Sequence, residues 1–166
     1  MRKRAILTEE ERRFVLGQRV ARLATADAAG HPHLVPVCYA FDGTCFYTPL
    51  DEKPKRVAVR KLRRVRNIEE RPEAALLIDH YEDDWSRLGY VLVEGEARLL
   101  QPGDEQQRQA LLLLRARYPQ YQGMALEELP VIMLTPRAVT SWGPALAQAA
   151  DRNRSSGPPS SESEPA

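Results

Sequence analysis

The sequence predicts a mainly β fold of the α+β class, in which an antiparallel sheet closes toward a barrel with helices at its flanks. Residues 90–100 alternate apolar and polar side chains with the period of a strand. Asp42-Gly43 is a strong hairpin signal, and tight turns of this kind join antiparallel strands. The expected order is helix, three strands, helix, two strands, helix and strand. Closing such a sheet into a barrel removes its exposed edges.

The first three predicted strands follow a short N-terminal helix. Thr8 followed by Glu9-Glu10-Glu11 fits a capping box, and these acids complement the helix dipole. The helix is expected over residues 8–17, with Phe14 toward the core. Pro36 cannot donate a ladder hydrogen bond, so its strand is expected to be edge-like or interrupted there. The three strands are predicted at 20–26, 33–41 and 45–48.

The second half of the chain alternates helices and strands. Helices are predicted at 56–70 and 104–117, and strands at 74–81, 90–100 and 131–142. The first of these helices has a narrow apolar stripe at Leu62, Val65 and Ile68, which indicates the side that faces the core. Asp104 follows Pro102-Gly103 and is expected to cap the second helix.

Length and composition favour one domain, residues 1–143, followed by a tail at residues 144–166. A chain of 166 residues suits a single hydrophobic core, and 43% hydrophobic with 28% charged residues is ordinary for a globular protein. Residues 152–166 are rich in Ser, Pro and Glu and contain no large apolar residue. Such a segment cannot bury enough surface to fold, so the tail is expected to be disordered.

The overall charge indicates no particular partner, and the sequence contains no signal for insertion into a membrane. The formal net charge is +1. The basic start of the chain lacks the apolar run of a signal peptide, and no run of about 18 apolar residues could span a bilayer. A cytosolic protein is therefore expected.

Conventional catalytic and metal-binding patterns are missing from the sequence. Cys38 and Cys45 flank the hairpin turn, and two reduced thiols are favoured over a disulfide across it, with no zinc spacing nearby. No serine lies in a nucleophile elbow and no histidine pair has metal-ligand spacing. The lack of such motifs is consistent with an enzyme whose cofactor performs the chemistry, and equally with a non-catalytic binding module.

The most informative stretch places a strand end before a basic loop and a helix start. Phe46-Tyr47-Thr48 ends a strand with a hydroxyl, and Lys53-Pro54-Lys55-Arg56 supplies cations. Free amides at a helix start and nearby cations favour a phosphate. A solvated basic loop is the alternative interpretation.

The helix that follows is unusually basic, with Arg60, Lys61, Arg63, Arg64 and Arg66. A solvated face explains this pattern, and so does an anionic cofactor tail. Nucleic acid is disfavoured because the net charge is near zero and no aromatic residues are interleaved with the cations.

Two tryptophans lie where the periodic patterns end. Trp85 and Trp142 could each cap a planar ring system, or pack in the core or in a dimer interface.

Several of these motifs carry a family resemblance. Residues 22–25 (Arg-Leu-Ala-Thr), 30–37 (Gly-His-Pro-His-Leu-Val-Pro-Val) and 46–48 resemble the opening of the pyridoxamine 5'-phosphate oxidase-like, FMN-binding split-barrel superfamily. Residues 61–68, Pro72 and residues 75–85 resemble its branch that uses the deazaflavin coenzyme F-420, and residues 79–85 are the more specific part. The resemblance covers roughly residues 8–143. It implies a mainly β (α+β) fold, an antiparallel split β-barrel with flanking helices.

The resemblance also implies a homodimer with two cofactor sites at the subunit interface. It places the backbone around Val35, Pro36 and Val37 against the tricyclic ring of the cofactor. It places a set of polar and basic residues around or near the phosphate: Thr48, Lys53, Lys55, Arg56, Lys61, Arg64 and Asn67.

The leading functional hypothesis is therefore hydride transfer between the reduced deazaflavin and a small organic acceptor. The long anionic tail of coenzyme F-420 would use the many cations between residues 53 and 66. An FMN-dependent oxidase or reductase is the alternative, followed by a cofactor-binding protein without turnover. No catalytic residue is identified, although Tyr39, Tyr81 and His80 are candidate proton donors.

Overall fold

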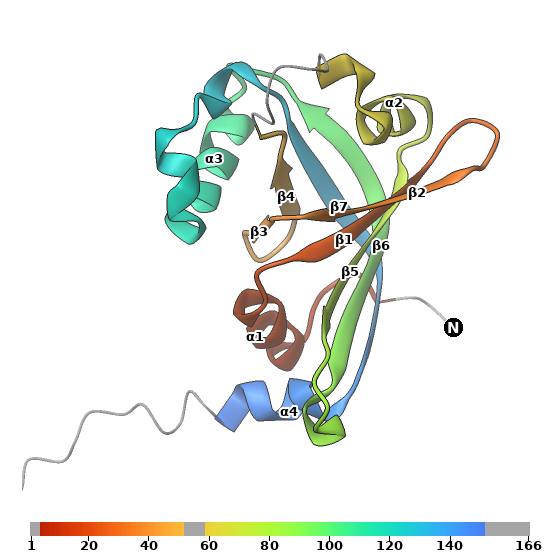
Figure 1. The fold of residues 1–166 in the computed structure, drawn as a ribbon, viewed down its shortest axis with the longest axis vertical. Helices are drawn as coiled ribbons and strands as arrows, with labels where there is room; N and C mark the ends of the chain where they lie inside the picture. The colour runs from red at the N-terminus through yellow and green to blue at the C-terminus, as the bar shows by residue number, and fades with distance from the viewer. Residues whose placement is uncertain (1–3, 52–58, 152–166) are drawn as a thin grey trace, which may run out of the picture.

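The computed structural model describes residues 4–51 and 59–151. One seven-stranded sheet has the order β2-β1-β5-β6-β7-β4-β3, and every neighbouring pair is antiparallel. Figure 1 shows this sheet strongly curled but open, with α1 and α3 beside it, α2 above and α4 below. The curled half-barrel with flanking helices confirms the split-barrel fold predicted from the sequence.

The strands are β1 (Ala21–Ala26), β2 (Pro32–Val37), β3 (Ala40–Phe41), β4 (Phe46–Pro49), β5 (Glu73–His80), β6 (Gly89–Leu100) and β7 (Val131–Trp142). The helices are α1 (Glu9–Gly17), α2 (Arg63–Glu70), α3 (Glu105–Arg117) and α4 (Pro144–Asp151). Short 3-10 turns occur at η1 (Val59–Lys61), η2 (Trp85–Arg87), η3 (Pro119–Gly123) and η4 (Leu126–Glu128).

The capping box of α1 is present as predicted and extends into a buried network. The Glu11 amide donates to Thr8 Oγ1 at 3.3 Å, and the Thr8 amide donates to Glu11 Oε2 at 2.7 Å. Glu11 is buried, and its carboxylate also accepts two hydrogen bonds from Arg4 and one from Ser141 Oγ on β7 at 2.7 Å. Phe14 lies in the core as expected. The network therefore fastens α1 to the last strand.

The second predicted strand is both an edge strand and an interrupted one, but the break is not at Pro36. β2 continues through Pro36 at the edge of the sheet, where a missing donor is tolerated. The break falls at Cys38 and Tyr39, whose backbone groups bond to side chains instead. The Tyr39 amide donates to Tyr118 Oη at 3.1 Å, and Cys38 O accepts from Thr48 Oγ1 at 2.7 Å.

The predicted helix at 56–70 is shorter than the sequence suggested. Residues 52–58 lie outside the described residues, and η1 and an extended residue, Leu62, precede the first turn of α2. The predicted apolar stripe is confirmed, because Val65 and Ile68 are buried and Leu62 packs against the same core. In α3, Asp104 has the N-cap position, but its carboxylate accepts from the Gln101 amide instead of a helix amide.

Contrary to the expectation from the sequence, the tail does not begin at residue 144. Residues 144–151 form α4, whose Leu146 is buried in the main core. Gly143, with a φ of +117°, allows the sharp turn between β7 and α4, and an added Cβ would lie 2.4 Å from Leu88 O. The local sequence Pro-Ala-Leu-Ala suits a helix, and Leu146 gives it an anchor. Residues 152–166 lie outside the described residues.

Two hydrophobic clusters fill the molecule. The larger one joins α1, α2 and the inner side of the sheet, and the smaller one joins α3, η3 and the β3–β4 hairpin. Val35 and Val37 pack against the larger cluster, whereas Cys38 and Tyr121 belong to the smaller one. The seam between the clusters therefore opens at the edge strand β2.

No helix within residues 4–51 and 59–151 is long and apolar enough to cross a bilayer.

Candidate functional site

A hollow of about 160 Å³ lies at this seam. The edge strand β2 forms one wall, the end of β4 forms the floor, and α2 and η3 close the other sides. It is lined by Val20, Val35, Pro36, Val37, Cys38, Thr48, Pro49, Asp51, Arg64 and Tyr121. An edge strand leaves backbone N–H and C=O groups without strand partners, so this wall can offer hydrogen bonds to a ligand.

Among the described residues that line this hollow, Arg64 supplies the positive charge. Its Nε is buried and has no hydrogen-bond partner among the described residues. Burial lowers the pKa of the Arg64 guanidinium, and the nearby Asp51 carboxylate opposes that change. A buried donor without a partner costs free energy. An anionic ligand in the hollow would supply the missing acceptor.

Thr48 is buried at the end of β4 and faces the same hollow. Its Oγ1 donates to Cys38 O at 2.7 Å, which holds the end of β2 against β4. The hydroxyl proton is therefore engaged, and Thr48 must release the Cys38 carbonyl before it can donate to an anion.

A second hollow of about 300 Å³ lies on the other side of α2, against the β1–β2 turn. Arg63 and Arg66 supply its cations and Asp27 and Glu70 its acids. His33 on β2 lies near one of these arginines and near Arg64: burial lowers its pKa, and the charges of Arg63 and Arg64 lower it further. The α2 side of β2 therefore has a positive local potential.

The structure brings together five of the residues that the resemblance assigned to the cofactor: Val35, Pro36, Val37, Thr48 and Arg64. Asn67 is not among them. It is buried and donates from Nδ2 to Thr25 Oγ1 at 3.0 Å, a contact that ties α2 to β1.

The other assigned residues lie elsewhere. Lys61 is exposed in η1 and does not line the hollow. Trp85 and Trp142 are 71% and 57% exposed, and neither lines the hollow, because η2 and the end of β7 lie at the lower end of the molecule (Figure 1). Lys53, Lys55 and Arg56 lie outside the described residues.

Sequence reasoning missed five residues that line the hollow, Val20, Cys38, Pro49, Asp51 and Tyr121, of which the last two are the most polar. Tyr121 lies in a non-periodic segment after α3, and Asp51 follows the strand end without any motif. Burial raises the pKa of the Tyr121 phenol, and its hydrogen bond with Cys38 raises it further, so the phenol stays protonated. No local signal connects Tyr121 with β2, because only the fold brings η3 to this edge.

The candidate proton donors named from the sequence lie outside the hollow. Tyr39 is buried, and its phenol donates to Val15 O and Gln18 O. Burial raises its pKa. Tyr81 is 70% exposed, and His80 pairs with Glu82 at 3.0 Å.

Cys38 and Cys45 are free thiols. In the part of the chain that the structure describes, no three His, Cys, Asp or Glu side chains gather at metal-binding distances.

Comparisons with known proteins agree with this architecture. The family model described as pyridoxamine 5'-phosphate oxidase matches residues 7–143. No curated protein matches the sequence significantly.

Three solved structures share the fold at low sequence identity. The heme storage protein HutZ from Vibrio cholerae has a TM-score of 0.66 and 17% identity, over 84% of this chain and 99% of that one. A conserved hypothetical protein from Mycobacterium tuberculosis has a TM-score of 0.67 and 22% identity, over 89% and 93%. A FAD-binding protein from Mesorhizobium loti has a TM-score of 0.60 and 20% identity, over 85% and 97%.

Proposed function

Because the chain belongs to the pyridoxamine 5'-phosphate oxidase family, we propose that it is an oxidoreductase that uses the deazaflavin coenzyme F-420. The reaction is hydride transfer between the reduced cofactor and a small organic molecule. The observation that carries the proposal is the buried, unpartnered Nε of Arg64 in a hollow beside the edge strand β2. That donor fits a phosphate oxygen of the cofactor.

The size of the hollow supports a role in binding the anionic end of the cofactor. About 160 Å³ is below the usual range for a site that encloses a whole ligand of drug size. A phosphate fits beside Arg64, and the tricyclic ring would lie along the open edge at Val35, Pro36 and Val37. Pro36 has no N–H and is exposed, so it offers an apolar surface to a planar ring.

The second hollow favours the deazaflavin over FMN. Arg63 and Arg66 lie on the same helix as Arg64 but line a separate hollow. FMN carries one phosphate and needs only the first hollow. The tail of coenzyme F-420 continues past its phosphate with several carboxylates, which the second pair of arginines would bind.

The residues of the chain would contribute binding, orientation and exclusion of water, because hydride chemistry is supplied by the cofactor when it is bound. Val35 and Val37 pack against the core and fix the strand that supports the ring. Tyr121 keeps its proton across the physiological pH range, since burial and Cys38 raise its pKa. Its hydroxyl would donate to a ligand only after releasing Cys38, as Thr48 must release the Cys38 carbonyl.

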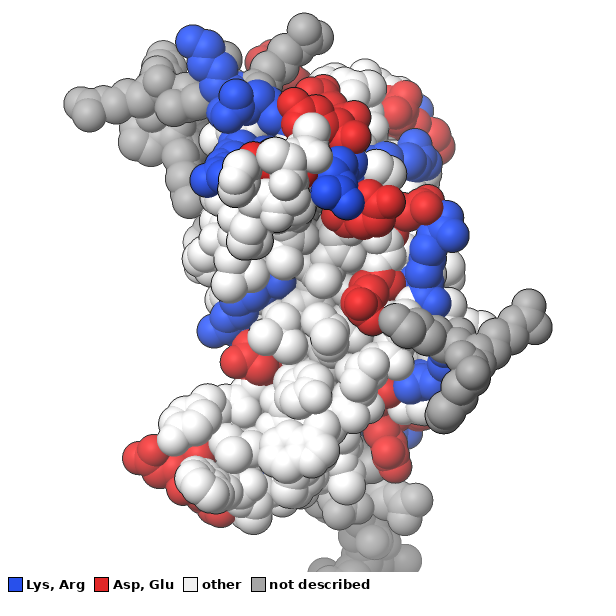
Figure 2. All heavy atoms as spheres, turned by 90° about the vertical axis from the view of Figure 1, so that its right-hand side faces the viewer, with Lys and Arg blue, Asp and Glu red and all other residues white. Residues whose placement is uncertain are grey.

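A second copy of the chain would complete the site. The ring side of the hollow is open in a single chain, and the exposed Trp85 and Trp142 lie away from it. Figure 2 shows that the middle of the lower half of one face is largely uncharged, with acidic side chains at its lower-left edge. A homodimer formed over such a face would cover exposed apolar surface and supply aromatic side chains to the partner's cofactor.

The proposal is tested by measuring the equilibrium binding of coenzyme F-420 and of FMN to the purified protein, with fluorescence quenching as the readout. Arg64→Gln should lower the affinity for both cofactors about tenfold or more, because a charge-assisted hydrogen bond is lost. The double variant Arg63→Gln/Arg66→Gln should weaken coenzyme F-420 by a similar factor and leave FMN within about twofold. Glu69→Gln on the exposed side of α2 is the matched control.

Each result has a distinct meaning. Tight binding of FMN alone would replace the deazaflavin with the flavin alternative. Heme is included as a third titrant, since fold neighbours include a heme storage protein. Binding of heme with neither flavin would contradict the redox proposal and favour a non-catalytic binding protein.

A further inference from the structure

A third cavity, of about 280 Å³, lies between α1, α4 and the turn that joins β5 to β6. It shares no lining residue with either of the two hollows described above. The strand that lines this cavity is β5, through His80 at its end, whereas β2 lines the first hollow. β1 lies between β2 and β5 in the sheet. Nothing in the proposed cofactor chemistry uses this cavity.

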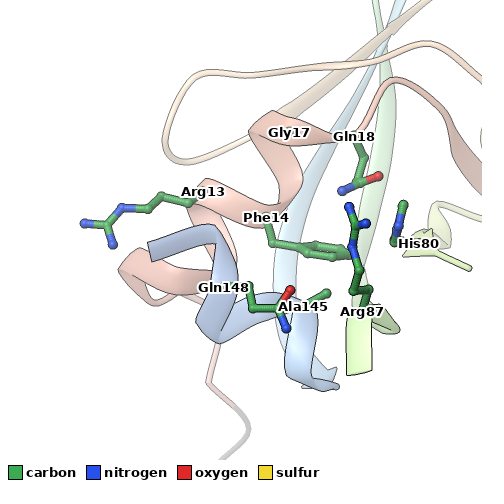
Figure 3. A pocket seen from close by; sticks show the side chains of 8 residues that line it. All are labelled: Arg13, Phe14, Gly17, Gln18, His80, Arg87, Ala145 and Gln148. Atoms are coloured by element: carbon green, nitrogen blue, oxygen red, sulfur yellow. The ribbon is translucent and has the colours of Figure 1, made fainter. Parts of the chain in front are cut away.

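The cavity combines an apolar floor with polar side chains that converge on it. Figure 3 shows the Phe14 ring reaching into its centre, with Gln18, His80 and Arg87 gathered at one end and Gln148 below. Ala145 adds a second apolar group. Such a mixture of an apolar surface and a few convergent polar groups is typical of small-molecule sites.

Arg87 has hydrogen-bonding capacity to spare. Glu82 binds its Nη1 at 2.9 Å and also pairs with His80 Nε2 at 3.0 Å. A guanidinium has five N–H donors, so this single pair leaves others for a ligand. Glu82 reduces the positive charge but holds Arg87 in place.

Gln18 is the second group that points to a ligand. Its side-chain amide has no hydrogen-bond partner among the residues that the structure describes, and Figure 3 shows it directed toward Arg87. By contrast, the Gln148 amide donates to Ser86 O at 3.0 Å. A free amide beside a partly free guanidinium forms a pair of donors for one planar oxyanion.

From this geometry we infer that the cavity binds a small carboxylate with an apolar body. The carboxylate would accept hydrogen bonds from Arg87 and Gln18, and the apolar body would lie on Phe14 and Ala145. A volume of about 280 Å³ equals that of about nine waters in the liquid, which sets the size of the ligand. Benzoate, with about nine non-hydrogen atoms, is a suitable probe.

Isothermal titration calorimetry with benzoate and with neutral benzamide tests the inference. Benzoate should bind with a Kd of about 1 mM, as expected for so small a ligand, and benzamide at least about tenfold more weakly. The comparison uses the unaltered protein, so it stands even if a variant fails to fold.

Three variants locate the binding to individual side chains. Arg87→Gln should lower the affinity for benzoate about tenfold, and Gln18→Leu should lower it by a smaller factor. Circular dichroism checks that both variants are folded. Arg13→Gln is the matched control: it removes the same charge at the rim, but Arg13 points away from the cavity and pairs with Glu9 at 3.4 Å (Figure 3). The affinity of Arg13→Gln for benzoate should stay within about twofold of that of the unaltered protein.

Three results would overturn the inference. These are no saturation up to about 20 mM benzoate, equal binding of benzoate and benzamide, or equal weakening by Arg13→Gln and Arg87→Gln. None of them depends on coenzyme F-420, so the inference and the proposed function fail independently.

Discussion

Two charged side chains, the buried Glu11 on α1 and the half-buried Arg64 on α2, have opposite environments. Glu11 accepts hydrogen bonds from the Arg4 side chain, from Ser141 and from the Thr8 amide. Arg64 has a buried Nε with no partner among the described residues. Both groups lost water on folding, but only the first regained its hydrogen bonds. The satisfied charge therefore belongs to the scaffold, and the unsatisfied one marks the place where a ligand is expected.

Removing the satisfied charge should cause the largest loss of stability. Glu11→Ala breaks the capping box, frees Arg4 and leaves Ser141 without its acceptor, and we expect a loss of about 3 kcal/mol in the free energy of unfolding. Urea denaturation measures it. Glu10→Ala, an exposed acid in the same helical turn, should change stability by no more than about 0.5 kcal/mol. Equal losses in the two variants would show that the Glu11 network contributes nothing special.

Acid should weaken the same network in the intact protein. Burial alone would raise the pKa of Glu11, but hydrogen bonds from Arg4, Ser141 and Thr8 bring it down from 4.5 to about 2. Because the folded pKa is depressed, the stabilisation is complete above pH 4.5 and is lost as the pH falls toward 2.

The neutral variant Glu11→Gln isolates this titration from that of the other acids. It should be less stable than wild type at neutral pH, and the gap should narrow between pH 4.5 and pH 2 in urea denaturation series. A gap that stays constant with pH would contradict the assignment.

Removing the unsatisfied charge should have the smallest effect and the opposite sign. Arg64→Leu replaces a buried donor that lacks a partner with an apolar group, so we expect stability to rise by up to about 1 kcal/mol. Asn67→Ala, one turn later on the same helix, breaks a buried hydrogen bond to Thr25 and should cost about 1.5 kcal/mol. A loss of more than about 1 kcal/mol in Arg64→Leu would mean that Arg64 is structural.

Local signals in the sequence were enough to predict most of the fold. The capping box at Thr8, the alternating pattern of 90–100 and the Asp42-Gly43 turn each depend on neighbours in the chain, and the structure contains all three elements. The errors occurred where contacts with residues far away in the sequence determine the local structure. Tyr118 and Thr48 bind the backbone of Tyr39 and Cys38 and break the second strand there, and neither contact can be read from the strand itself.

The candidate site was predictable only in part for the same reason. Thr48 and Arg64 belong to motifs of the chain, whereas Tyr121 reaches the hollow through η3, far along the sequence. Asn67, expected near the phosphate, lines the second hollow and donates a hydrogen bond to Thr25 on β1. Motif positions show which residues recur together, whereas the fold decides which of them share a cavity.

The open edge at β2 also affects how copies of the chain can meet. An unpaired edge strand is a template on which a foreign strand can add, the first step of β-aggregation. β2 carries prolines at both Pro32 and Pro36, which remove two of the amides that such a strand would need. At the other edge, β3 is only two residues long. The sheet can therefore keep an edge free for a small molecule without offering it to strands of other chains.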